Sequence, residues 1–453
     1  MFRVRTGRIE ESRLLERLRI QGFITEPVEG IAGFHRVVEG PGALSATTEH
    51  WLGLLYVQQA STGTAAPALA PRPGEHVLDL CSAPGGKTLH MAELMQDSGC
   101  VVASELSEPR IRGLLGNVYR LGHSNILVTA ADGRDFPRGA TFDRVLVDAP
   151  CSGEGTLRRG GGKAPDQSAS FLGYVTRAQS QLLERAVEVT RPGGVIMYVT
   201  CTFAPEENEA IVSDALRRLP VDLEWLDLPV PHARGLTSFE GRQFDPRVEG
   251  AARIYPHHLD SGGLFLARLR RLGAGEARGS GSRVPASFPG DALTGEEAEA
   301  RLAPALEELR TRYGAGGELD HLRWMFRGGR AWFHTLDAWP LPMWEEGDWR
   351  AISVGIRGLD FDSRGRARPS NDLMRLFGDR LQGRVVDVGD DEIRALLSRA
   401  TVPSVESQRG PIALRHRGDV VGRGAVTADG LKSEMPKARA ADYRRSIDPG
   451  ERS

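Results

Sequence analysis

The stretch that decides the fold is HVLDLCSAPGGKTLHMAELM, residues 76–95. It opens with a short apolar run, turns on two consecutive glycines and continues in a helical pattern. A strand that passes through a glycine turn into a helix lets backbone N–H groups approach a ligand closely. This unit predicts both an α/β fold and a ligand site at the turn.

Further strands and helices alternate on the C-terminal side of this unit. The strand-like runs are VVASEL (101–106), NILVT (125–129), FDRVLVDAP (142–150) and VIMYVT (195–200), and the helical segments between them include PRIRGLLGNVYRLG and RAQSQLLERAVEVTRPGG. Because the strands are continuous apolar runs, we expect a doubly wound, Rossmann-like parallel sheet that is covered on both faces. Ligands of such sheets bind beyond the carboxyl ends of the strands.

A change in composition divides the chain. Residues 272–295, LGAGEARGSGSRVPASFPGDALTG, are rich in Gly, Ser and Pro and lack periodicity, which predicts a linker. We therefore expect a small N-terminal α+β piece over 1–70, a catalytic domain over 71–271 and an accessory region over 296–453. Residues 51–70 have a mixed helical periodicity, and deletion of 296–453 is expected to leave cofactor binding intact.

Composition excludes several classes of protein. A net charge of −2 argues against a protein that only coats nucleic acid, and 40% hydrophobic residues suffice for real cores. No run of about 18 apolar residues is present, so we expect no membrane span, and the start carries no apolar signal segment, which predicts a cytoplasmic protein. The four cysteines have no zinc-binding spacing, so we expect free thiols and no metal site.

The glycine turn, Cys81-Ser82-Ala83-Pro84-Gly85-Gly86-Lys87, has three possible interpretations. It can be a structural turn only. Its end resembles the phosphate loop G-x-x-x-x-G-K-[ST], with VLVDAP as the acidic strand, but Cys81 stands where that loop needs glycine and Pro84 lacks an N–H. The third interpretation is a nucleoside cofactor site of the S-adenosylmethionine type.

Two acidic residues favour the third interpretation. Glu105 ends the second strand, where a carboxylate can accept hydrogen bonds from both ribose hydroxyls. Asp132 follows the third strand and can accept a hydrogen bond from an adenine amino group. Either acid alone is unremarkable on a surface, but the two in series after consecutive strands indicate a nucleoside.

The next two strands end in reactive side chains. Asp148-Ala149-Pro150-Cys151 follows one strand and Thr200-Cys201-Thr202 ends the next. A lone cysteine is usually a packed thiol, whereas two at adjacent strand ends can serve nucleophilic catalysis. Carbon 5 of cytosine becomes nucleophilic once a thiolate has added to carbon 6, and a carboxyl group near ring N3 stabilises the charge that develops. Cys201, Cys151 and Asp148 supply these groups.

These segments resemble a known family. VLDLCSAPGGKT, DAPCSGEGT and YVTCTFAPEENEAIV are similar to the signature motifs of the Nop/Nol/Sun RNA cytosine-5 methyltransferases. LGLLYVQQAST and RIYPHHLDSGGLFLARLRR extend the resemblance over roughly residues 40–271. It implies a seven-stranded class I methyltransferase sheet with an antiparallel last strand at LFLARL, S-adenosyl-L-methionine as cofactor and RNA as substrate.

The resemblance also implies roles for single residues. It makes Cys201 the nucleophile and Cys151 the residue that assists product release, and it assigns Cys81 through Lys87 to the cofactor loop. It places Glu105 at the ribose, Asp132 at the adenine, and Asp148 near both the methionine part of the cofactor and the target base. In DNA cytosine methyltransferases the Pro-Cys cysteine attacks, so Cys151 remains a rival nucleophile.

The C-terminal part carries a second resemblance. VGIRGLDFDSRGRARPSNDLMRLFG and GDVVGRGAVTADGLKSEMPKARAADYRR are similar to the extension of bacterial small-subunit rRNA methyltransferases of the F type, which ends in an RNA-binding module of the PUA type. The alternative is an accessory domain that only adds stability.

Two segments depart from the family pattern. Arg3-Val4-Arg5-Thr6 stands at the chain start where the family has Arg-Val-Asn-Thr after other helices, so we expect either that the preceding helices are missing or that the start of the sequence is misassigned. The loop Arg158 to Lys163 is unusually rich in glycine and is either a basic loop over the RNA backbone or an ordinary solvated loop.

These observations lead to one function and three alternatives. We expect a monomeric methyltransferase that acts on cytosine in 16S rRNA or in the assembling small subunit. A tRNA substrate, a catalytically inactive RNA-binding assembly factor and a phosphate-loop nucleotidase remain the alternatives.

Overall fold

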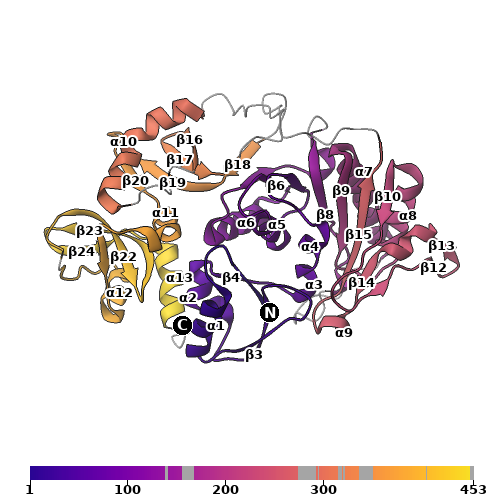
Figure 1. The fold of residues 1–453 in the computed structure, drawn as a ribbon, viewed down its shortest axis with the longest axis horizontal. Coiled ribbons are helices and arrows are strands. Elements are labelled where there is room, and N and C mark those ends of the chain that lie inside the picture. Colours follow the sequence, from indigo (N-terminus) through magenta and orange to yellow (C-terminus); the bar gives the residue numbers. More distant parts are fainter. Residues whose placement is uncertain are drawn as a thin grey trace.

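The computed structural model describes residues 1–137, 141–155, 168–273, 292–293, 295–314, 319, 322–335, 350–404 and 406–448. A large central sheet is flanked by a smaller sheet near the N-terminus and by two more in the C-terminal part (Figure 1). Most of the predicted linker over 272–295 lies outside the described residues, and helix α10 (Gly295–Tyr313) follows it.

The central sheet has the predicted doubly wound order. Five parallel strands run in the spatial order β7 (Ile126–Ala130), β6 (Cys100–Glu105), β5 (His76–Asp79), β8 (Phe142–Asp148) and β9 (Thr190–Thr200). β15 (Leu264–Arg271) pairs antiparallel with β9, and β10 (Val221–Glu224) pairs antiparallel with β15. The antiparallel last strand at LFLARL is therefore confirmed. The seven predicted strands belong to a sheet that has ten strands among the described residues, because β14 (Ala252–Ile254), β11 (Ala233–Arg234) and one strand of the C-terminal part extend its edges. The strands after β5 are added first on one side, as β6 and β7, and then on the other, as β8 and β9, and this switch between β5 and β8 opens a crevice at the strand ends.

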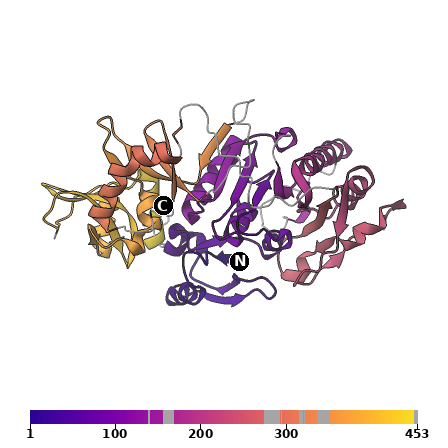
Figure 2. The same ribbon diagram turned by 45° about the horizontal axis from the view of Figure 1, so that its top comes forward.

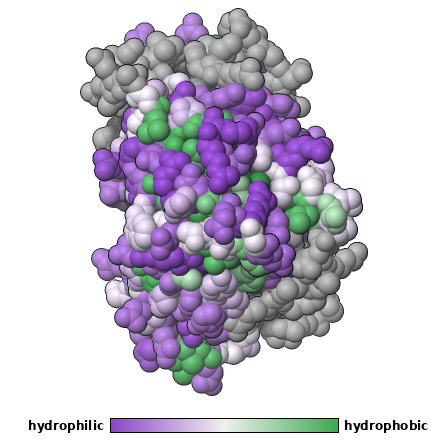
Figure 3. Space-filling model, turned by 90° about the vertical axis from the view of Figure 1, so that its right-hand side faces the viewer, coloured by the Kyte–Doolittle hydropathy of each residue, from purple (hydrophilic) through white to green (hydrophobic). Residues whose placement is uncertain are grey.

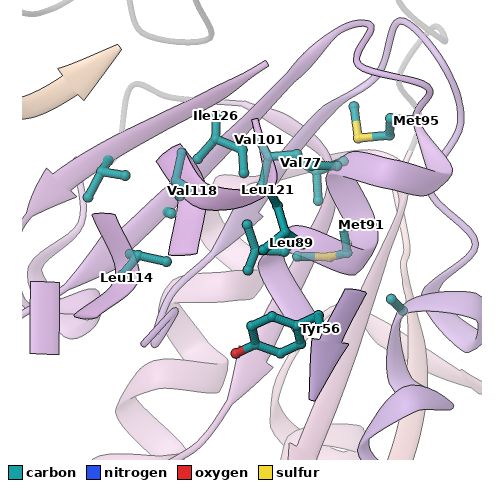
Figure 4. Close-up of a cluster of buried hydrophobic side chains, with 14 of the residues drawn as sticks. Tyr56, Val77, Leu89, Met91, Met95, Val101, Leu114, Val118, Leu121 and Ile126 are labelled. Carbon is teal, nitrogen blue, oxygen red and sulfur yellow. The ribbon is translucent and has the colours of Figure 1, made fainter. Parts of the chain in front are cut away.

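Both faces of this sheet are buried, as the apolar strands predict. Alternate residues of one strand enter different cores, since Val77 packs with helices α5 (Gly86–Leu94) and α6 (Glu108–Leu121), whereas Leu78 packs with α7 (Ala169–Val189) and α8 (Glu209–Arg218). Figure 4 shows the first core, where Leu89, Met91 and Leu114 of the helices meet Val77, Val101 and Ile126 of the strands. The covered faces hold the strand ends rigidly in one plane.

The N-terminal piece is a four-stranded sheet that leads into the central fold. Its strands are ordered β2 (Ile24–Pro27), β3 (Phe34–Glu39), β1 (Phe2–Val4) and β4 (Leu55–Val57), and α1 (Glu11–Ile20) lies between β1 and β2 in the chain. The helical periodicity expected over 51–70 is only partly right. β4 separates α2 (Thr48–Leu52) from α3 (Ala60–Gly63) and α4 (Ala65–Leu69), because its partner β1 lies some 50 residues away in the chain and leaves no local signal.

The C-terminal part is not a detached unit. Strand β18 (Arg350–Val354) joins the central sheet antiparallel to β7, with Val354 opposite Leu127. Figure 2 shows its orange arrow beside the purple strands of the core. The composition break did not predict this strand, which covers an edge that would otherwise present unpaired backbone groups.

Two further sheets and several helices complete the C-terminal part. Its elements are β16 (Arg323–Arg327), β17 (Arg330–His334), β19 (Ile356–Phe361), β20 (Ala367–Pro369), α11 (Asn371–Leu376), β21 (Val385–Asp387), α12 (Asp390–Leu397), β22 (Gly410–His416), β23 (Asp419–Thr427), β24 (Gly430–Ser433) and α13 (Lys437–Ile447). Its assignment to the PUA type stays a prediction.

The N-terminal piece and the C-terminal part share one hydrophobic core. Trp51 of α2 packs against Tyr443 of α13, with ring centroids 4.5 Å apart. The buried Arg375 donates hydrogen bonds to the carbonyls of Leu52, Arg120 and Tyr119, and thereby connects all three parts of the chain. We call this contact region, built on Trp51, Arg375 and Tyr443, the joint.

The face on the right-hand side of Figure 1 is mostly hydrophilic, and its hydrophobic residues form isolated spots (Figure 3). Within the described part of the chain, none of the helices has the length and apolar character needed to cross a membrane.

Candidate active site

A single cavity of about 1110 Å³ opens at the carboxyl ends of the central strands. All of the predicted site residues line it: Cys81, Ser82, Ala83, Pro84, Gly85, Gly86, Lys87, Glu105, Asp132, Asp148, Cys151 and Cys201. They come from five successive strand ends, so the topology brings together side chains that are up to 120 residues apart in the chain.

The loop after β5 is held by buried hydrogen bonds. Ser82 donates to the Ser104 carbonyl from both its N–H and its hydroxyl, each at 2.9 Å. Gly85 has φ +111°, and a Cβ there would lie 2.9 Å from Leu114 Cδ1, so glycine is required on both counts. The backbone can therefore pass close to a ligand at this point.

A buried carboxyl group anchors the same loop. Asp79 accepts hydrogen bonds from Thr88 Oγ1 at 2.6 Å and from the N–H of Cys81 at 3.2 Å. Burial raises the pKa of Asp79 to about 7, against the effect of these bonds. Sequence reasoning did not select Asp79, although it lies inside the VLDLC motif.

Glu105 ends β6 as an almost fully buried carboxylate on the cavity wall. Its oxygens accept from the N–H groups of Ser107 at 2.9 Å and Ala83 at 3.3 Å, and it forms an ion pair with Arg110 at 3.3 Å. Arg110 also donates to the Ala83 carbonyl at 2.5 Å. The sequence analysis did not identify Arg110 as a site residue. The one feature of the sequence that could have done so is its position at the start of the helix that follows Glu105.

Asp132 lies beyond β7, on the same side of the cavity. It accepts hydrogen bonds from the backbone and the side chain of Arg134, and these lower the pKa of Asp132. A charged carboxylate therefore lines the same cavity as Glu105. Two carboxylates in series and an open glycine turn fit a nucleoside cofactor such as S-adenosylmethionine.

The two thiols lie next to each other. Cys151, just after β8, and Cys201, just after β9, have sulfurs 3.2 Å apart, and the N–H of Cys201 donates to the Cys151 sulfur at 3.3 Å. A hydrogen bond from the Cys151 thiol lowers the pKa of Cys201, whereas the same bond and burial raise the pKa of Cys151. The arrangement favours a thiolate on Cys201 beside a neutral thiol on Cys151.

Charged neighbours act on both thiols. Lys87 forms an ion pair with Asp148 at 2.6 Å, and the negative charge of Asp148 raises the pKa of Cys201 while the positive charge of Lys87 lowers it and partly offsets that effect. Burial opposes the charge on Lys87, but Asp148 outweighs it and raises the pKa of the lysine. Glu207 acts on Cys151 instead and disfavours a second thiolate. Because Lys87 is engaged by Asp148, the geometry argues against a phosphate loop.

A buried network positions the segment around Cys201. Glu207 accepts from the hydroxyl and the N–H of Ser152 at 2.5 and 3.0 Å and from Gln179 at 2.8 Å. Asn208 accepts from Thr200 at 2.5 Å and donates to the Thr202 carbonyl at 3.0 Å. Sequence reasoning used the Glu-Asn-Glu run only as a family mark and missed this role.

Other segments close the cavity. Tyr56, Gln58 and Gln59 come from the N-terminal piece, and Asp260, Ser261 and Gly263 from the turn before β15. Residues 158–163, the predicted basic loop, lie outside the described residues. Among the described residues, no group of three or more His, Cys, Asp or Glu side chains is placed to hold a metal ion.

Comparison with known proteins identifies relatives. Residues 66–270 match the family described as 16S rRNA methyltransferase RsmB/F. The chain is 32% identical over 372 residues to the ribosomal RNA small subunit methyltransferase F of Klebsiella pneumoniae, covering 80% of this chain and 74% of that protein. It is 37% identical over 224 residues to the tRNA (cytosine(49)-C(5))-methyltransferase of Pyrococcus abyssi, covering 49% and 72%.

A solved structure supports the same relationship. The methyltransferase homolog from Pyrococcus horikoshii has 33% sequence identity and a TM-score of 0.55, over 60% of this chain and 86% of that one. The chain spans only 29% of the length of the 28S rRNA cytosine-C(5) methyltransferases of Mus musculus and Homo sapiens. The motifs, the sheet order and these similarities together show that the chain belongs to the RsmB/F family of RNA cytosine-C5 methyltransferases.

Proposed function

We propose that this protein transfers a methyl group from S-adenosyl-L-methionine to carbon 5 of a cytosine in 16S rRNA, through a covalent bond between Cys201 and the base. The observation that carries the proposal is the pair of sulfurs 3.2 Å apart, with Lys87 acting on one of them and Glu207 on the other. Two cysteines of unequal acidity suit a reaction in which one attacks and the other assists.

The residues of the chain account for each chemical requirement. The Cys201 thiolate adds to carbon 6 and breaks the ring conjugation, which makes carbon 5 nucleophilic. Asp148, held by Lys87, would stabilise the charge that develops on the ring. After methyl transfer, a base takes the proton from carbon 5, the electron pair of that C–H bond re-forms the double bond between carbons 5 and 6, and Cys201 leaves as a thiolate. Cys151 lies beside that sulfur and assists this last step.

The cofactor supplies the electrophilic methyl group when it is bound. Cys81 through Lys87 would cradle its methionine part, Glu105 would bind the ribose hydroxyls and Asp132 the adenine. These residues follow β7, β6 and β5, which are neighbours in the sheet, and β8 and β9 come next. The cofactor would therefore extend from its adenine near β7 to its methionine part near β5, on the side of the sheet that leads to Cys201.

The extent of the similarity favours rRNA over tRNA as the substrate. Relatives named for the small-subunit RNA match 80% and 97% of this chain, and the longer match must include most of the C-terminal part, whereas the tRNA enzyme matches 49%. The intact thiols and carboxylates disfavour an inactive assembly factor.

Bisulfite sequencing tests the proposal. The purified protein and S-adenosylmethionine are incubated with unmodified 16S rRNA, with assembled small subunits and with tRNA. We expect new 5-methylcytosine in the ribosomal samples only. Methylation of tRNA alone would contradict the rRNA assignment, and no methylation of any RNA would contradict the enzymatic function.

A further inference from the structure

The two cavity thiols are in direct contact. The sulfurs of Cys151 and Cys201 lie 3.2 Å apart, and a disulfide bond is about 2.05 Å long, so joining them requires an approach of roughly 1.2 Å. Rotation of the two side chains can supply a movement of this size. The pair can therefore be joined without a change in the fold.

The backbone holds the two cysteines side by side. Ahead of them, the Ala149 N–H donates to the Val199 carbonyl at 2.9 Å, which continues the pairing of β8 with β9. Directly after them, the hydroxyls of Ser152 and Thr202 share a hydrogen bond of 2.7 Å. Because bonds on both sides fix the distance between the two segments, the thiols have a far higher effective concentration for each other than two free molecules have.

The pair differs from the other two cysteines in access or in acidity. Cys151 and Cys201 are half-buried and line the open cavity, whereas Cys100 is fully buried in β6. Cys81 also lines the cavity, but burial and the charge of Asp79 raise the pKa of its thiol. Oxidants attack accessible thiolates, and the hydrogen bond from Cys151 favours the thiolate on Cys201. Cys201 is therefore the cysteine that an oxidant attacks first, with Cys151 beside it.

We propose that Cys151 and Cys201 form a modification site, which a peroxide closes into a reversible intramolecular disulfide when no cytosine occupies the cavity. This inference goes beyond the proposed function, because it concerns the same thiols without RNA. The disulfide removes the nucleophile, and it also protects Cys201 from further oxidation to sulfinic acid, which thiol reductants do not reverse. A dithiol reductant restores the active pair by exchange.

The reaction proceeds in two balanced steps. In the first, the Cys201 thiolate attacks one oxygen of hydrogen peroxide, a sulfur–oxygen bond forms, the O–O bond breaks and hydroxide leaves. This step oxidises the sulfur by two electrons to a sulfenic acid and reduces the peroxide. In the second, the Cys151 sulfur attacks the Cys201 sulfur, so that the sulfur–sulfur bond forms and the sulfur–oxygen bond breaks. The hydroxyl group leaves with the Cys151 proton as water.

Peptide mapping tests the proposal. Reductant-free protein without RNA is treated with hydrogen peroxide, its remaining thiols are alkylated, and it is digested without reduction. Trypsin cleaves after Lys87, Arg110 and Arg185, so the four cysteines lie on separate peptides. We expect one cross-link, between the Cys151 and Cys201 peptides, which dithiothreitol removes. Methyl transfer to 16S rRNA should fall to background in the oxidised protein and recover on reduction.

Single variants separate the two roles. In Cys151→Ala the sulfenic acid on Cys201 has no thiol beside it, so the same treatment should yield sulfinic acid there, and dithiothreitol should not reverse it. In Cys201→Ala the Cys151 side chain should remain a thiol. Cys100→Ala is the matched control and should form the cross-link as wild type does.

Three results would each overturn the inference. They are four free thiols after peroxide treatment, a cross-link that involves Cys81, and sulfinic acid on Cys201 that forms in wild type as readily as in Cys151→Ala. The cross-link is detected without RNA, so its formation does not depend on methyl transfer. If it forms in a protein that methylates no RNA, the proposed function fails and this inference stands.

Discussion

The cavity and the joint are built in opposite ways. Every cavity residue that carries chemistry lies within a few positions of a strand end and within a short motif, such as Asp148 and Cys151 in DAPC. The joint consists of single residues from distant segments, and the hydrogen bond from Arg375 to the Leu52 carbonyl spans 323 positions of the chain. The reactive side chains of the cavity can therefore be found from short sequence motifs. The contacts that hold the three parts of the chain together depend instead on how side chains from distant segments pack.

This difference separates two kinds of mutational effect. Changes in the cavity should alter catalysis or cofactor binding and leave the fold intact. Changes in the joint should unfold the protein although they touch no catalytic group. The following five predictions test that separation.

The largest effect is expected at the thiols. Cys201→Ala should abolish both methyl transfer and the covalent RNA adduct, because it removes the thiolate that adds to carbon 6 in the proposed reaction. Cys151→Ala should still attack and methylate, but release should stall and leave protein bound to RNA on a denaturing gel. Cys100→Ala, buried in β6, is the control. An adduct that persists in Cys201→Ala and disappears in Cys151→Ala would reverse the two roles.

A change in the joint should cost stability. Tyr443→Ala removes a fully buried ring that packs on Trp51 and bonds His416 at 2.8 Å, which should lower the free energy of unfolding by about 3–5 kcal/mol. Chemical denaturation measures it, with the exposed Tyr174→Ala as the stability control.

Deletion of residues 296–453 should be more damaging still, because it removes β18 and exposes half of the shared core. The sequence alone predicts instead that the shortened protein binds cofactor normally, so the experiment decides between the two expectations. A stable truncated protein with full cofactor affinity would show that the joint is dispensable.

The third effect is confined to the cofactor. Glu105→Ala should weaken S-adenosylmethionine binding by about 1.5–3 kcal/mol for each charge-assisted hydrogen bond that is lost. Isothermal titration calorimetry measures the change. The exposed Glu108→Ala serves as the matched control, and Glu105→Asp should fall between the two. Unchanged affinity in Glu105→Ala would exclude this carboxylate from the site.

The smallest effect is a shift in pH dependence. The positive charge of Lys87 favours the Cys201 thiolate, so Lys87→Met should raise the pKa of that thiol. The pH at which iodoacetamide alkylates Cys201 half-maximally should therefore move upward, and reactivity at neutral pH should fall. Mass spectrometry follows the site, with Lys432→Met as control. If the pH dependence of Cys201 alkylation is unchanged in Lys87→Met, the hydrogen bond from Cys151, and not the charge of Lys87, sets the pKa of Cys201.

The sequence by itself determined the parallel sheet and the composition of the cavity. Strands β5 to β9 are apolar runs between helices that end at recognisable C-caps, such as Gly122 after α6. The local pattern of apolar residues was therefore sufficient to predict these strands and helices. The residues from Cys81 to Cys201 could be chosen because the reacting groups of such sheets follow the strand ends.

Only the tertiary structure decided how these groups are paired and what holds them. The contact between the two thiols and the Lys87–Asp148 pair depend on side chains from different elements. β18 and the joint arise from pairing and packing over hundreds of residues. Such contacts depend on complementary shape in three dimensions, which no short pattern in the chain records.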